Sequence, residues 1–148
     1  MKKYFKCCLF SLVLLITALP VNAQRSERFG AYELHYNVVN STFLSPEVAA
    51  AYGIVRAEDQ AFINLALRKH GDDSHVTIHP MTLKGSASDL MQRKQMLEFQ
   101  LIEEGEAIYY IAPFHFLNRE WLVFDIQFQP EGSDEHHQFK YKYQLYKN

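Results

Sequence analysis

The stretch FKYKYQL at residues 139–145 decides the fold class of this chain. Every second residue is apolar or aromatic, from Phe139 to Leu145, and each residue between them is polar. Successive side chains of a β-strand point to opposite faces of the sheet, so this pattern predicts a strand with one buried face and one solvated face.

Six further runs share the alternation or an enrichment in β-branched and aromatic residues, at residues 32–38, 63–67, 75–83, 97–101, 107–112 and 122–128. Pro80 lies within the third run and confines it to a sheet edge or interrupts it. Seven strands that are each apolar on one side must bury those sides against one another. The sequence therefore predicts an all-β fold, an antiparallel immunoglobulin-like sandwich of about seven strands, with a small barrel as the alternative.

One segment has helical signals, and it predicts a short helix near residues 46–52. Ser45 is a good N-cap, Pro46 suits the first helical position, Glu47 complements the helix dipole, and Gly53 can end the helix. A helix of two turns is not stable alone, so we expect it to pack on the sandwich.

The longer segment around this helix, residues 37–56, is too long for an ordinary hairpin loop. It has two interpretations, because long connections on rigid sandwiches often carry binding residues. Either Phe43 and Leu44 are buried and plug one open end of the sandwich, or the segment is a binding surface. In the second case the candidate partner-binding residues are Asn37, Asn40, Phe43, Leu44 and Arg56.

The first 23 residues have the features of a secretory signal peptide. A basic start precedes an apolar run from Cys7 to Leu19, and small residues lie just before Gln24. The apolar run is shorter than the roughly twenty residues of a membrane span. We therefore expect cleavage of residues 1–23, a single domain over residues 24–148, location in the periplasm, and no membrane insertion after cleavage.

The expected mature chain has seventeen acidic residues against twelve basic ones, a net charge of −5. Nucleic acids and anionic membrane surfaces are bound through basic patches, so this charge argues against both as partners. The only cysteines are Cys7 and Cys8, and both lie inside the expected signal peptide. The mature chain is thus expected to fold without disulfides and to lack a thiolate nucleophile or metal ligand.

Several blocks of the sequence resemble a family of secreted bacterial proteins catalogued as domain of unknown function 4426. The principal block is HYNVVNSTFLSPEVA at residues 35–49, followed by Tyr52-Gly53-Ile54 and Arg56; shorter matches are residues 64–66, 108–112 and 143–146. The resemblance covers essentially the whole expected mature chain. It implies a small exported protein of Gram-negative bacteria, and it supplies no catalytic or binding residue.

The seven histidines raise the possibility of a metal site. His75 and His79 have a spacing that binds zinc on a helix, but in a strand four residues span about 13 Å, too far for one ion. His136 and His137 are adjacent and would point to opposite faces of a strand, although in a loop they could converge. We expect no metal site and no cofactor, and these two histidines are the residual candidates.

Motifs of common enzymes are missing from the sequence. No serine lies in a Gly-x-Ser-x-Gly elbow, and neither a P-loop nor a Gly-x-Gly-x-x-Gly motif is present. The sequence therefore predicts a non-enzymatic periplasmic protein, a binding or accessory module for another envelope protein or a small ligand. The alternative is a periplasmic metal-binding or metal-delivery protein that uses surface histidines.

Overall fold

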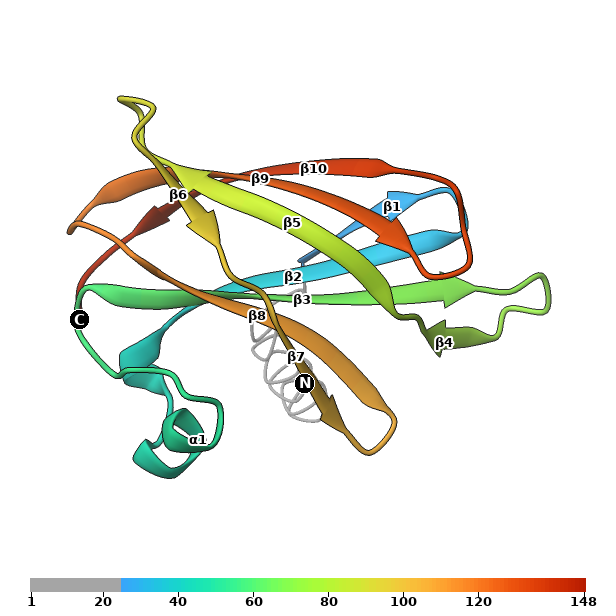
Figure 1. Ribbon diagram of the computed structural model, residues 1–148, viewed down its shortest axis with the longest axis horizontal. Helices are drawn as coiled ribbons and strands as arrows, with labels where there is room; N and C mark the ends of the chain where they lie inside the picture. Colours follow the sequence, from blue (N-terminus) through green and yellow to red (C-terminus); the bar gives the residue numbers. More distant parts are fainter. Residues whose placement is uncertain (1–24) are drawn as a thin grey trace, which may run out of the picture.

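The computed structural model describes residues 25–148, which form two packed β-sheets (Figure 1). The expected signal peptide, residues 1–23, lies outside the described residues. The elements are β1 (Arg25–Phe29), β2 (Tyr32–Asn40), a 3-10 turn (Ser41–Phe43), α1 (Pro46–Ala51), β3 (Gln60–His70), β4 (Val76–Ile78), β5 (Met81–Ser88), β6 (Lys94–Leu97), β7 (Gln100–Glu104), β8 (Ala107–His115), β9 (Glu120–Pro130) and β10 (His137–Leu145).

The two sheets are antiparallel throughout. The six-stranded sheet has the order β1-β2-β3-β8-β7, with β4 also paired to β3, and the four-stranded sheet has the order β10-β9-β5-β6. The prediction of an antiparallel sandwich with one short helix is confirmed, and the barrel alternative is not what forms. The α1 helix lies against one sheet, at the end of the molecule where β3 begins (Figure 1).

The main core fills the space between the sheets, as the alternating pattern predicts. In β10, Phe139 and Leu145 are both 1% exposed, whereas Lys140 and Lys142 are exposed. The inward side chains of β2, β3 and β9 alternate in the same way, and Leu34, Leu65 and Phe124 are fully buried. Burial of these apolar faces is the main stabilising contribution in a chain of this size.

The strands of the structure differ from the predicted ones at two places. The run at residues 97–101 is not one strand, because β6 ends at Leu97 and β7 begins at Gln100. Glu98 and Phe99 carry the chain from the four-stranded sheet to the six-stranded sheet, so each half of the run belongs to a different sheet. The strand β1 was not predicted, because an edge strand that is mostly exposed lacks the alternation of a half-buried one.

The segment that contains α1 covers part of the outer face of the six-stranded sheet. Ser45 caps the helix, its Oγ accepting from the Val48 N–H at 3.3 Å. Ala49 and Ile54 pack on Phe62 and Ile111, which point outward from β3 and β8, and Leu44 packs beside them. This second apolar cluster explains why the segment folds where it does.

Phe43 does not join this cluster, since 71% of it is exposed. The expectation that Phe43 is buried is therefore wrong, and the segment does not close an open end of the sandwich. The reason is local: the 3-10 turn of residues 41–43 buries Ser41 instead and leaves Phe43 facing solvent.

The C-terminal residues form hydrogen bonds with two loops that are distant in the sequence. Tyr146 accepts a hydrogen bond from Asn40 Nδ2 at 2.7 Å, Lys147 N donates to Asn118 Oδ1 at 3.0 Å, and the Asn148 side chain donates to Thr42 Oγ1 at 3.2 Å. These contacts connect the end of the chain to the turn after β2 and to the β8–β9 loop. In the described part of the chain, no helix has the length and apolar character needed to cross a bilayer.

Candidate functional site

The six-stranded sheet divides into two branches beside β3. β8 pairs with β3 only as far as Leu65 and Tyr110, whereas β4 pairs with β3 from Arg68 to His70. Beyond Tyr110, residues 107–109 of β8 remain paired with β7 alone. The β7–β8 hairpin accordingly diverges from β3 and β4 (Figure 1).

A hollow of about 690 Å³ lies at this division, and we call it the outer groove. Most of its residues come from β2, β3 and β8. The lining residues are Arg25, His35, Tyr36, Asn37, Asn64, Ala66, Arg68, Ile78, Ala107, Ile108, Tyr109 and Tyr143. Its volume falls in the range of small-molecule sites, and it combines aromatic and aliphatic surface with a few polar groups, as such sites do.

His35 is the most unusual residue of the outer groove. It is 9% exposed, and both of its ring nitrogens are buried with no hydrogen-bond partner among the described residues. Burial lowers the pKa of the His35 imidazole, and the nearby positive charge of Arg68 lowers it further. His35 is thus neutral at pH 7, with one donor and one acceptor nitrogen unused. Unused buried polar groups are uncommon because each carries a desolvation cost.

The carboxylate of Glu33 does not satisfy His35. Its Oε1 accepts from Ser26 Oγ at 2.7 Å, and its Oε2 is 2.7 Å from His70 Nε2. The distance from Oε1 to His35 Nε2 is 3.7 Å, too long for a hydrogen bond. These bonds, that to Ser26 first, hold the pKa of Glu33 below its ordinary value.

The Ser26, Glu33 and His70 arrangement differs from a catalytic triad in the order of its hydrogen bonds. In a catalytic triad the histidine accepts the proton of the serine, and the carboxylate orients the histidine. Here the carboxylate lies between the serine and the histidine, so the serine donates to Glu33, a weak base because its pKa is lowered, and has no contact with the histidine. The network connects β1, β2 and β3 and leaves His35 free.

Asn37 and Asn64 lie side by side on the outer face, because they are directly paired between β2 and β3. The Oδ1 of Asn64 is buried and has no hydrogen-bond partner in the described part of the chain. Together with His35, this amide gives the outer groove three unused buried polar atoms. A bound ligand with complementary groups would satisfy them.

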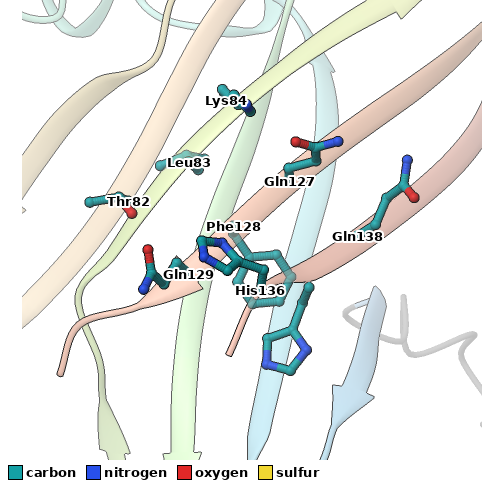
Figure 2. A pocket seen from close by; sticks show the side chains of 9 residues that line it. Thr82, Leu83, Lys84, Gln127, Phe128, Gln129, His136 and Gln138 are labelled. Atoms are coloured by element: carbon teal, nitrogen blue, oxygen red, sulfur yellow. The ribbon is translucent and has the colours of Figure 1, made fainter. Parts of the chain in front are cut away.

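A second hollow, of about 450 Å³, lies on the four-stranded sheet (Figure 2). Polar side chains from β5, β9 and β10 line it, including Thr82, Lys84, Gln127 and Gln138, all of them exposed. Figure 2 shows these side chains projecting from a broad sheet surface, with His136 beside Gln129 and Phe128. Because its polar groups are open to water, this hollow gives weaker evidence of a ligand site than the outer groove does.

The two residual metal candidates, His136 and His137, both line this second hollow. His136 is exposed, while His137 packs against the rings of Phe29 and Phe128 at centroid distances of 5.3 and 5.1 Å. Within residues 25–148, no group of three or more His, Cys, Asp or Glu side chains is arranged to hold a metal ion.

Only one of the five predicted partner-binding residues lines the outer groove. That residue is Asn37, which is exposed there. Asn40 and Arg56 hydrogen-bond to backbone carbonyls, of Tyr146 at 2.7 Å and of Thr42 at 3.3 Å, so their contacts stabilise the fold. Leu44 belongs to the second apolar cluster, and Phe43 is exposed away from it.

Sequence reasoning missed His35, Asn64 and Arg68. Each lies on the polar side of a predicted strand, where exposure to water is the ordinary expectation. A signal was nevertheless present, since positions 35 and 37 of one strand and 64 and 68 of another all carry polar groups that can recognise a ligand. Only the register between β2 and β3 shows that they share one face.

A family model, described as Domain of unknown function (DUF4426), matches residues 26–148. The chain belongs to the DUF4426 family. The resemblance seen in the sequence is thereby confirmed. A crystal structure of a DUF4426 family protein from Pseudomonas aeruginosa is 35% identical, with a TM-score of 0.72, and the match covers 84% of this chain and 95% of that one. No curated protein matches this DUF4426 chain in sequence.

More distant structures share the fold of this DUF4426 protein. FetP of uropathogenic Escherichia coli strain F11, isolated after expression in the periplasm, matches with a TM-score of 0.61 over 84% of this chain and 94% of its own. A copper-bound variant of FetP also matches with a TM-score of 0.61, over 85% of this chain and 97% of its own. Both are 9% identical, so the likeness concerns the fold alone.

Proposed function

We propose that this DUF4426 protein is a non-enzymatic binding module of the bacterial periplasm that holds its ligand in the outer groove. The observation that carries the proposal is that His35 and Asn64, which line a single hollow, together have three buried polar atoms without hydrogen-bond partners in the described chain. Hydrogen bonds from a ligand to such atoms make the free energy of binding more favourable, because the cost of burying these atoms has already been met in folding. The ligand that we propose is another envelope protein or a small molecule.

The periplasmic location rests on the basic and apolar start of the chain and the small residues before Gln24. The recombinant expression of FetP, which shares the fold, in the periplasm agrees with it. The non-enzymatic character is supported by the Ser26–Glu33–His70 order, in which the serine donates to a weakly basic carboxylate and not to a histidine, and by the missing enzyme motifs.

Site-specific photocrosslinking in living cells tests this function. A photoreactive amino acid is placed at Asn37 in the outer groove or at Gln127 on the opposite sheet, both of which are exposed. The proposal expects the protein in the osmotic-shock fraction and a specific adduct from position 37 but not from position 127. Equal adducts at both positions, no adduct at position 37, or retention in the cytoplasm would contradict it.

A second candidate function is metal binding, and one observation favours it. Neutral imidazole nitrogens are metal ligands, and those of His35 are unused. FetP, which shares the fold, has a copper-bound variant. Calorimetry with copper(II) and zinc(II) decides the matter: a one-to-one site tighter than about micromolar that is lost in His35→Gln would establish metal binding, and no such heat would exclude it.

A further inference from the structure

The charges around the outer groove are unbalanced. Its lining includes Arg25 and Arg68 but no aspartate or glutamate. Glu33 lies directly opposite Arg68 in the strand register, yet its carboxylate is bound to Ser26 and His70. Arg68 forms no ion pair with any residue between 25 and 148. The groove therefore has a guanidinium without an ion-pair contact beside the unpartnered His35.

We propose that the outer groove recognises a carboxylate that is followed closely by an amide N–H, as at the carboxyl end of a peptide or in an N-acylated amino acid. This inference rests on the binding function proposed above. The Arg68 guanidinium matches a carboxylate in geometry and charge. The N–H of His35 supplies a further donor to the same group.

The neighbouring groups match the rest of such a ligand. Asn64 Oδ1 is a buried acceptor without a donor, and an amide N–H would supply one. Asn37 lies beside it and offers a second amide. Tyr109 and Ile78 line the same hollow and can cover an apolar side chain of the ligand. Capture of a terminal carboxylate by fixed polar groups is an established mode of peptide recognition.

Nuclear magnetic resonance titration of the purified protein provides the test. The probe is N-acetyl-alanyl-phenylalanine, and its control is the same dipeptide with a C-terminal amide, which has nearly the same shape but no charge. We expect the acid to shift the side-chain signals of His35 and Asn64 and to bind at least tenfold more tightly than the amide. Arg68→Gln should remove this preference, whereas Arg56→Gln, outside the groove, should retain it.

The pH dependence gives a second readout that loss of folding would not mimic. Glu33 on β2 and Arg68 and His70 on β3 are the charged or titratable groups around His35. A bound carboxylate favours the protonated imidazole, so affinity for the acid should rise as the pH is lowered from 8 to 6. Affinity for the amide should stay constant, and His35→Gln should remove the pH dependence.

Further arms separate the alternatives. N-acetyl-phenylalanine and N-acetyl-Gly-Gly-Ala-Phe distinguish a small acylated amino acid from a peptide end. If the groove binds a peptide end, the longer probe should bind more tightly than N-acetyl-phenylalanine. If it binds an acylated amino acid, the two affinities should be equal. Equal affinity of acid and amide, or shifts at Thr82 and Gln127 instead of His35, would overturn the carboxylate inference. If neither dipeptide binds while photocrosslinking from Asn37 succeeds, the inference fails and the binding function remains.

Discussion

Ser41 is a small residue with an unusually large structural role. It is completely buried, and its hydroxyl both donates to Ala57 O and accepts from Ala57 N, each at 3.0 Å. One side chain thereby links two positions sixteen residues apart, at the two ends of the segment that carries α1 and packs on the outer face of the six-stranded sheet.

We expect Ser41→Ala to lower the free energy of unfolding by about 1–3 kcal/mol, because it leaves the part-buried N–H of Ala57 without an acceptor and removes one of the two donors to the Ala57 carbonyl, which keeps only Gln60 N–H. Denaturant titration followed by circular dichroism measures the change. Thr42→Ala is the neighbouring control and should have a smaller effect, since Thr42 Oγ1 accepts only from the exposed Asn148 side chain.

Phe43 and Leu44 should respond very differently to truncation although they are adjacent. Leu44→Ala removes contacts with the second apolar cluster and should cost about 1–3 kcal/mol, less than for a fully buried leucine. Phe43→Ala removes a side chain that is 71% exposed, and it should change stability by less than about 0.5 kcal/mol. Equal shifts of the urea midpoint in the two variants would contradict this assignment.

His35 should make the stability of the protein sensitive to mild acid. Burial lowers the pKa of its imidazole from 6.5, so the unfolded chain takes up a proton that the folded chain resists. The resulting stability is fully present above pH 6.5 and is lost as the pH falls through the folded-state pKa. The lowered pKa of Glu33 adds a similar loss in more acidic solution.

Urea midpoints measured between pH 7.5 and 5 test this expectation. The wild-type midpoint should fall with acidification, and the slope should be shallower in His35→Gln. His115→Gln, which replaces an exposed imidazole, serves as the control and should keep the wild-type slope. Parallel curves for the wild type and His35→Gln would contradict the role of His35.

At the scale of elements, the contact between β5 and β9 depends on a glycine. A Cβ added at Gly85 would lie 2.5 Å from Ile126 Cδ1 and 3.0 Å from the Asp125 carbonyl oxygen. Gly85 faces the main core directly opposite Ile126, which is fully buried. The close approach therefore lets the Ile126 side chain cover the backbone of β5.

Gly85→Ala should destabilise the protein by about 1–3 kcal/mol, because Ile126 or the strand must shift to accept the methyl group. Thermal unfolding measures the effect. A matched control is Gly105→Asn at the β7–β8 turn, where φ is +60° and no atom lies within 4 Å of an added Cβ. Asparagine tolerates this conformation, so the control should stay close to wild type.

The elements also show how far the sequence could predict the structure. Strands with one buried face, such as β10, were predictable because alternation reports burial directly. The run at residues 97–101 was misjudged because Leu97 and Leu101 belong to different sheets, and periodicity contains no information about a change of sheet. The outer groove was missed for a related reason, since polar residues on an outer face become a site only through the pairing of strands.

For the whole molecule, the two sheets and the apolar core between them must account for stability without disulfides. Both cysteines of the chain lie at positions 7 and 8, before the described residues. We expect the form beginning at Gln24 to give a β-rich circular dichroism spectrum and to melt at the same temperature with and without dithiothreitol. A helix-rich spectrum, or a melting temperature that falls in the reductant, would contradict this expectation.

The hydrogen bonds of Tyr146, Lys147 and Asn148 join parts of the chain that are far apart in the sequence. Two of them connect residues 106 positions apart, and the third connects residues 29 positions apart. Without these bonds, Asn40, Thr42 and Asn118 would lack the partners that hold the turn after β2 and the β8–β9 loop. Because closing a loop of such length costs conformational entropy, these contacts depend on the rest of the sandwich being already in place.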